Sequence, residues 1–162
     1  MDESIKDLID KKRMRNESAA EAEAKADAER YAKARNACFS LSERIASIIE
    51  TANYCIENGI SLPDKSTMKN YGYDYDAYAE GFYHGVGFKR PASGCPITHL
   101  CVKAGGACGH WDFYATSNKF YVRHENDSSK IGEPDVYKYE FFADRFPKFE
   151  RAFYGWIKDG MK

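Results

Sequence analysis

Several familiar signatures are absent from this chain of 162 residues. No apolar run approaches the roughly 18 residues that a membrane-spanning helix requires, and no glycine-rich nucleotide loop, hydrolase elbow, HExxH pair or zinc-finger spacing occurs. The N-terminus begins with acids and lacks the apolar stretch and small-residue cleavage site of a secretion signal. We therefore expect a cytoplasmic protein that is not an enzyme and carries no cofactor.

Dense positive charge is lacking as well. The formal net charge is −1. Between residues 37 and 85 seven acids oppose three bases, whereas between residues 86 and 125 five bases oppose two acids. A protein that binds duplex DNA usually concentrates Lys and Arg on one face. This distribution argues against duplex DNA, and the acidic middle of the chain favours a basic partner.

The chain does contain a long row of apolar or small residues spaced alternately by three and four positions. The row consists of Tyr31, Ala34, Cys38, Leu41, Ile45, Ile48, Ala52 and Cys55. This spacing places every member on one side of a helix, and a row of about three heptads is typical of helix pairing. We expect a helix from about Ser18 to Asn58, ended by Gly59, after a short amphipathic helix over residues 2–15. The sequence thus predicts a helical arm over residues 1–59 that self-associates through this row.

The remaining residues, 60–162, predict a small globular domain. Three β-branched or aromatic runs, separated by Gly-Gly and Ser-Asn turns, cover residues 97–103, 110–116 and 119–125. Such runs are typical of a three-stranded antiparallel meander. Helical spacing then recurs from Val136, and Pro147 can open a separate last helix. The predicted fold class is α+β, with a long coiled-coil-like N-terminal helix followed by the meander and C-terminal helices.

A tyrosine-rich segment precedes the meander, and we expect a short helix in it over Asp74–His84. Tyrosine offers rigid contact area at low entropy cost, and interleaved carboxylates suit an Arg/Lys-rich protein surface. The predicted partner-binding residues are Tyr71, Tyr73, Asp74, Tyr75, Asp76, Tyr78 and Glu80. The alternative is that the tyrosines form the rim of the core and the acids are solvated.

Five thiol and imidazole side chains fall within sixteen residues: Cys95, His99, Cys101, Cys108 and His110. Structural zinc sites usually present closely paired ligands such as Cys-x2-Cys, and no such pair occurs here. We therefore expect buried thiols and hydrogen-bonded histidines, and no metal. A cysteine nucleophile with a histidine base is the less favoured alternative, with backbone N–H groups of the glycine-rich turn before Cys108 holding an oxyanion.

These observations rank three functions. Small size, a helical arm and abundant tyrosine are typical of accessory proteins of mobile elements, including inhibitors of host nucleases. The leading hypothesis is a self-associating protein-binding module with a tyrosine and acidic surface for a basic, nucleic-acid-binding partner. The second is a binder of single-stranded nucleic acid that uses exposed aromatic residues on the meander. The third is Cys/His chemistry, with or without a metal.

Overall fold

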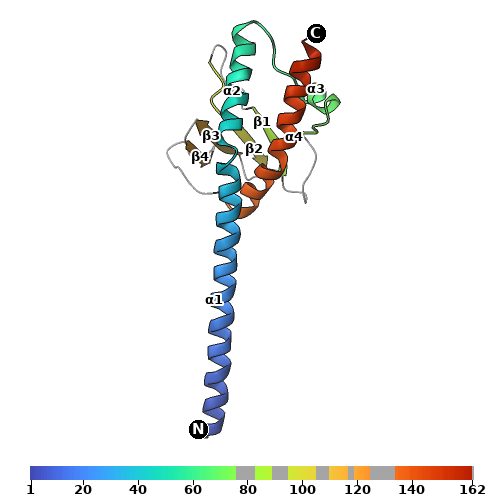
Figure 1. The fold of residues 1–162 in the computed structure, drawn as a ribbon. Helices are drawn as coiled ribbons and strands as arrows, with labels where there is room; N and C mark the ends of the chain where they lie inside the picture. Colours follow the sequence, from blue (N-terminus) through green and yellow to red (C-terminus); the bar gives the residue numbers. More distant parts are fainter. Residues whose placement is uncertain (76–82, 89–94, 105–109, 117–118, 125–133, 162) are drawn as a thin grey trace. The chain divides into compact units, whose positions relative to one another are not determined.

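The computed structural model describes residues 1–75, 83–88, 95–104, 110–116, 119–124 and 134–161. The chain divides into two compact units, Met1–Lys33 and Ala34–Lys162. In chain order the elements are α1 (Glu3–Phe39), α2 (Ser42–Glu57), α3 (Lys65–Asn70), β1 (Tyr83–Phe88), β2 (Leu100–Ala104), β3 (His110–Thr116), β4 (Lys119–His124) and α4 (Val136–Gly160) (Figure 1). The predicted α+β class is confirmed. The predicted boundary at residue 59 lies inside the second unit, because α2 packs on β3.

The first unit consists of the greater part of α1, and the helix is continuous where two helices were predicted. The expected interruption at Asn16-Glu17-Ser18 is wrong, since all three residues are helical. Asn and Ser each cost a helix well under 1 kcal/mol relative to Ala. The surrounding alanines and Glu/Lys pairs outweigh that cost.

The real interruption lies between α1 and α2, at Ser40 and Leu41, where one uninterrupted helix was expected. The hydroxyl of Ser40 donates to the carbonyl of Ala37, and the hydroxyl of Ser42 donates to the carbonyl of Phe39. Such local bonds from side chain to backbone compete with the helical hydrogen-bond ladder. The predicted stop after α2 is confirmed, because Gly59 follows its end with a φ of 73°, a conformation that favours glycine.

The four strands form one antiparallel sheet in the order β1-β2-β3-β4. Strands β2, β3 and β4 are the predicted meander, which is confirmed. Strand β1 was not predicted, and the helix expected over Asp74–His84 is wrong at both described ends. Asp74 and Tyr75 are not helical, and Tyr83 and His84 belong to β1. Gly85 and Gly87 disfavour a helix, and pairing with β2 gives their backbone groups partners instead.

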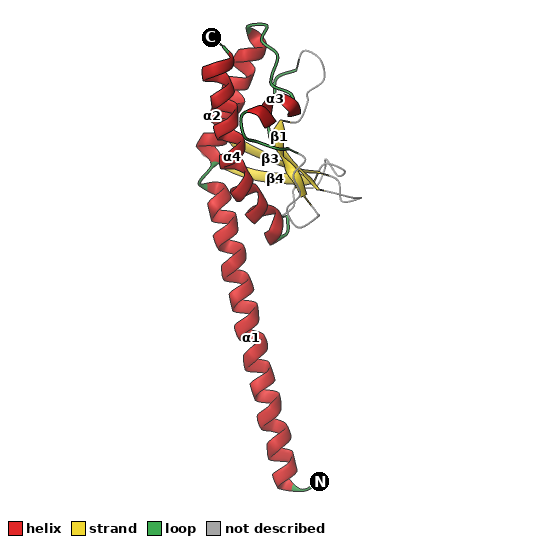
Figure 2. Ribbon diagram, turned by 90° about the vertical axis from the view of Figure 1, so that its right-hand side faces the viewer, coloured by secondary structure: helices red, strands yellow, loops and turns green. Residues whose placement is uncertain are grey.

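Helices α2 and α4 cover one face of the sheet, as Figure 2 shows. The core between these layers is aromatic: the fully buried ring of Phe113 on β3 stacks on Phe142 of α4, with ring centroids 4.2 Å apart. A bidentate ion pair between Arg44 and Glu150 joins α2 to α4. Pro147 lies inside α4 and does not open a separate helix, contrary to the prediction. Buried aromatic side chains on both sides of Pro147 hold one helix together despite its missing N–H.

The predicted self-association row lies almost entirely in this core. Cys38, Ile45, Ile48 and Ala52 are fully buried within one chain, Ala34, Leu41 and Cys55 are nearly so, and Tyr31 is half-buried. An apolar row at helical spacing packs equally well against a sheet and against a second helix. Because one chain already covers this row, it is not an open surface for a second copy. Within the described residues, no helix combines the length and the hydrophobicity that a bilayer-spanning segment needs.

Candidate functional site

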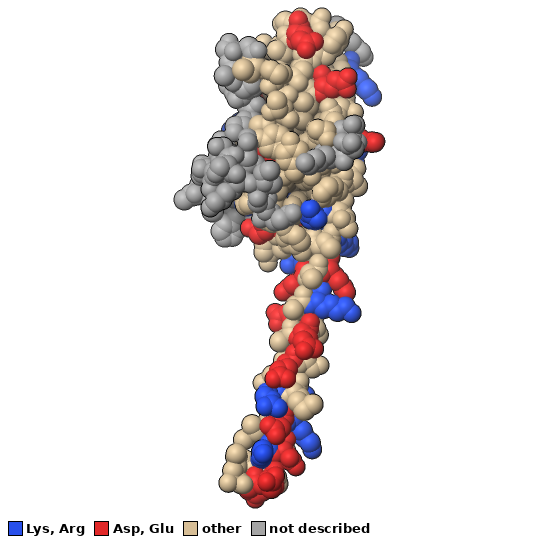
Figure 3. All heavy atoms as spheres, turned by 90° about the vertical axis from the view of Figure 1, so that its left-hand side faces the viewer, with Lys and Arg blue, Asp and Glu red and all other residues tan. Residues whose placement is uncertain are grey.

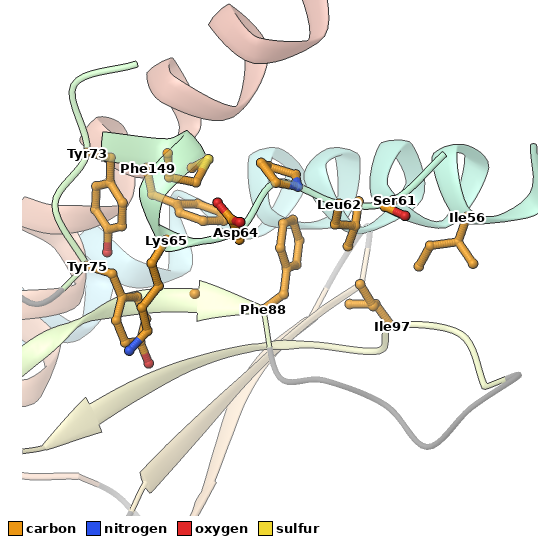
Figure 4. Close-up of a pocket in the computed structure, with 13 residues that line it drawn as sticks. Ile56, Ser61, Leu62, Asp64, Lys65, Tyr73, Tyr75, Phe88, Ile97 and Phe149 are labelled. Carbon is orange, nitrogen blue, oxygen red and sulfur yellow. The ribbon is translucent and has the colours of Figure 1, made fainter. Parts of the chain in front are cut away.

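A pocket with a volume of about 470 Å³ opens in the second unit, where the end of α2, the start of α3, β1 and α4 meet. Its lining residues are Ile56, Ser61, Leu62, Pro63, Asp64, Lys65, Met68, Tyr73, Tyr75, Gly87, Phe88, Ile97 and Phe149 (Figure 4). In the close-up, the rings of Phe88 and Phe149 lie between Tyr73 on one side and Leu62 and Ile56 on the other. The pocket is therefore apolar inside, with polar groups from Ser61 and the start of α3 around it. Its volume lies in the range of small-ligand and side-chain binding sites.

One wall of the pocket depends on Tyr73, whose side chain is almost fully buried. Its hydroxyl oxygen accepts a hydrogen bond of 2.6 Å from the N–H of Val86 and donates to the carbonyl of the same residue. These contacts give the backbone N–H and carbonyl of Val86 on β1 the hydrogen-bond partners that a further strand would provide. Burial is the main reason why the pKa of Tyr73 is raised. Tyr73 is thus a neutral structural group.

The two glycines of β1 let the tyrosine segment lie directly on the strand. A Cβ atom at Gly87 would meet the ring of Tyr75 at 2.7 Å, and one at Gly85 would meet the backbone oxygen of Tyr75 at the same distance. The ring of Tyr75 in turn carries the ammonium group of Lys65, 4.7 Å from its centroid. The spacing of two between Gly85 and Gly87 matches the spacing between Tyr73 and Tyr75, and this match is a signal for β1 that the prediction of a helix over Asp74–His84 overlooked.

The far wall is held by Asn53 of α2. Its side-chain amide donates to the carbonyl of Ile97 at 2.8 Å and accepts from the N–H of Ile97 at 2.7 Å. This pair of bonds fixes the segment before β2 against the helix, so that Ile97 is buried and lines the pocket. Asp64 caps α3 by accepting from the N–H of Thr67, which fixes the opposite rim.

The residues predicted to form a tyrosine and acidic partner surface lie in different environments in the structure. Tyr73 belongs to the core, which corrects its assignment to the surface, and Tyr75 lines the pocket. Half-buried Tyr71 donates from its hydroxyl to Asp159 of α4, and Asp74 is exposed, 4.0 Å from the ammonium group of Lys69. Asp76, Tyr78 and Glu80 lie outside the described residues.

On the sheet face opposite the core, the structure brings His99 and Asp112 together. The Nε2 atom of His99 lies 3.5 Å from Oδ1 of Asp112, and its Nδ1 lies 2.8 Å from the hydroxyl of Thr98. Asp112 is fully buried and His99 is 8% exposed. The complete burial of Asp112 on a strand of the meander was not foreseen from the sequence. The 2.8 Å contact with Thr98 orients the ring of His99, and its Nε2 lies close to the Asp112 carboxylate without a hydrogen bond between them. A defined ring orientation is a structural role as well as a requirement for acid–base chemistry.

The predicted cysteine and histidine cluster is only partly described. Cys101 is buried and pairs with Asp112 across the ladder between β2 and β3, whereas Cys95 is exposed. Cys108 and the side chain of His110 lie outside the described part of the chain. Among the side chains that the structure does describe, no three His, Cys, Asp or Glu residues come together around one point as a metal site requires.

Two aromatic rings lie side by side on this same face of the sheet. Tyr114 of β3 and Tyr121 of β4 are stacked, with centroids 5.0 Å apart and an interplanar angle of 7°, and both are half-buried. His99 lies against Tyr114 with ring centroids 4.5 Å apart. The predicted aromatic face of the meander is thus this tyrosine pair, while Phe113 faces the helices.

Comparison with protein-family models, with curated proteins and with solved structures finds no match for this chain.

Proposed function

We propose that this protein is a binding protein, not an enzyme, and that its pocket receives an apolar side chain of a protein partner with a basic surface. The observation that carries the proposal is the pocket of about 470 Å³. Most of its lining side chains are apolar, and the Tyr73 hydroxyl within it is already used by β1. An apolar lining of this kind can bury an anchor residue of a partner, but it supplies few polar groups for a chemical reaction.

The charge of the chain segment that forms the pocket supports a basic partner. Asp64 and Lys65 both line the pocket, and exposed Asp74, next to Tyr75, lies 4.0 Å from Lys69. Across residues 37–85, however, acids outnumber bases by seven to three. Complementary charge around an apolar anchor raises the association rate and adds specificity. The expected ligand is therefore a segment with one large apolar residue flanked by Lys or Arg.

Selection from a displayed peptide library against the full chain tests this proposal. We expect enrichment of peptides with an apolar anchor between basic residues, and affinity that falls as salt is added. Two pocket variants should abolish binding: Ile56→Lys, which places a cation at the rim, and Ser61→Trp, which fills the opening. The matched control is Tyr54→Lys, which makes the same charge change on α2 at a residue that is 68% exposed and does not line the pocket.

Thermal melting of each variant confirms that it is folded. The proposal is wrong if no basic, apolar-anchored peptide is selected, or if folded Ile56→Lys and Ser61→Trp bind the selected peptides as well as the control does.

A second candidate function, the binding of single-stranded nucleic acid, is favoured by the stacked pair Tyr114 and Tyr121. Bases stack on aromatic side chains of sheet surfaces, and each such contact contributes roughly 1–3 kcal/mol. Fluorescence anisotropy with a labelled single-stranded oligonucleotide should then show binding that Tyr121→Ala weakens and Tyr54→Ala does not. Equal binding by both variants would count against this candidate.

A further inference from the structure

The first unit is a helix whose apolar side chains have no cover within that unit. Ile5, Leu8 and Ile9 share one side of α1 and are 51%, 63% and 55% exposed. Of residues 1–33, all are exposed except half-buried Asp10 and Tyr31. Large apolar side chains clustered on an exposed helix indicate a surface that packs against something else.

The two halves of this unit have opposite characters. Residues 5–15 carry large apolar side chains, five cations and two acids: Lys6, Lys11, Lys12, Arg13 and Arg15 against Asp7 and Asp10. Residues 17–29 carry six alanines and five acids, and their single cation is Lys25. Figure 3 shows both signs of charge along the helix. Residues 5–15, the basic half, are therefore bulky with a net positive charge, and residues 17–29, the acidic half, are small with a net negative charge.

We propose that two copies of this chain pair through residues 1–33 of α1 in antiparallel orientation. This orientation lays the basic half of each copy against the acidic half of the other. A parallel pair would instead set Lys12 against Lys12 and Arg15 against Arg15. Charge complementarity thus selects a second copy as the occupant of this surface, and it selects the orientation as well.

Side-chain size agrees with this pairing. Ile5, Leu8, Lys12, Arg15, Ala19, Ala22, Ala26 and Glu29 follow one another at alternating spacings of three and four. When the midpoint is residue 17, Ile5 faces Glu29, Leu8 faces Ala26, Lys12 faces Ala22 and Arg15 faces Ala19. The last three contacts each join a long side chain to an alanine, and the aliphatic stems of Lys and Arg cover the alanines while their charges reach the acids.

The length of the unit agrees as well. Residue 17, the midpoint of the proposed pairing, is also the midpoint of Met1–Lys33, so the pairing of residues 5–29 lies centrally within the first unit. The surface differs from the row between Tyr31 and Cys55, which one chain already buries. It also does not involve the pocket, so the two proposals stand or fall separately.

Charge reversal in the full chain tests the pairing by sedimentation equilibrium. Wild type should be dimeric at micromolar concentration. Lys12→Glu/Arg15→Glu should weaken the dimer at least tenfold, and so should Glu21→Lys/Glu23→Lys. A mixture of these two variants should recover the dimer, and so should the chain that carries all four changes. Glu43→Lys/Glu50→Lys, at exposed sites of α2, is the matched control and should leave the dimer unchanged.

Cross-linking tests the orientation, in a Cys95→Ser/Cys108→Ser background that removes the exposed Cys95 together with Cys108, which lies outside the described residues. Under mild oxidation, Leu8→Cys mixed with Ala26→Cys should give a disulfide-linked dimer, whereas Ala26→Cys alone should not. The proposal is overturned by a monomeric wild type, by dimers that survive both reversals, by a mixture that stays monomeric, or by preferential linkage of Ala26→Cys to itself.

Discussion

At the scale of single residues, buried polar groups decide which tyrosines and cysteines are structural. The hydroxyl of Tyr73 both accepts from and donates to the backbone of Val86, at a site that excludes water. Tyr71, by contrast, uses its hydroxyl for one exposed bond to Asp159. We therefore expect two tyrosines only two positions apart to contribute differently to stability, although their sequence context is similar.

Replacing Tyr73 with Phe should lower the free energy of unfolding by about 1–3 kcal/mol, because the N–H and carbonyl of Val86 lose their partner in a buried site. Tyr71→Phe, the matched control, should cost less than about 1 kcal/mol, because water can replace its partner. Urea denaturation measures both values. Equal losses would show that the edge of β1 is solvated at Val86.

Alkaline pH should destabilise the protein through Cys38. Desolvation by burial raises the pKa of this thiol from 9.0 to about 12. Between these values the unfolded chain has released the proton and the folded chain still holds it, so stability falls as pH rises, by about 1.4 kcal/mol per pH unit. Burial also raises the pKa of Tyr73, which acts in the same direction.

Urea denaturation at a series of pH values checks this expectation. Cys38→Ala should give a shallower decline than wild type above pH 9, whatever its stability at neutral pH. Cys95→Ala, at an exposed site, should follow the wild-type decline. If the slopes for Cys38→Ala and wild type coincide, the Cys38 thiol is not the group that titrates.

At the scale of elements, α2 is a core helix. Its apolar row faces the sheet, and its Asn53 and Arg44 hold Ile97 and Glu150. An amphipathic face at helical spacing fits this packing and helix pairing equally, so the row alone could not distinguish a core helix from a dimer interface. The strands of the sheet supply the partner that the row needed.

Ile48→Ala should therefore lower the free energy of unfolding by roughly 2–5 kcal/mol, as the removal of a fully buried large aliphatic side chain does. It should leave the oligomeric state of the folded protein unchanged. Ser47→Ala, at the neighbouring exposed position, is the control and should change stability by less than about 0.5 kcal/mol. Denaturation and light scattering together measure both effects. If the Ile48→Ala protein stays folded but dissociates into monomers, the row between Tyr31 and Cys55 is part of the dimer interface.

At the scale of the whole molecule, the two units are stabilised in different ways. The second unit has an aromatic core between helices and sheet. The first unit has no such core, so its stability depends on helix propensity and on the proposed pairing with a second copy. Local stability follows buried apolar contact, so it should differ sharply between the units.

Hydrogen exchange should report this difference. In the Lys12→Glu/Arg15→Glu variant, amides of residues 3–33 should exchange orders of magnitude faster than those of α2 and α4. In wild type, protection of residues 3–33 should rise with protein concentration, while protection of α2 and α4 stays constant. Protection that is uniform along α1 at every concentration would contradict a helix stabilised by pairing.

Local pattern by itself determined much of this protein: the α+β class, the three strands of the meander, the stop at Gly59 and the helical character of both ends of the chain. These features depend on residues a few positions apart, which propensity and periodicity describe. Tertiary structure decided the rest. The assignment of Tyr73 to the core, the existence of β1 and the pocket itself depend on contacts such as Asn53 with Ile97, 44 positions apart. Spacing along a chain shows that an apolar side must be buried, but only the folded chain shows what buries it.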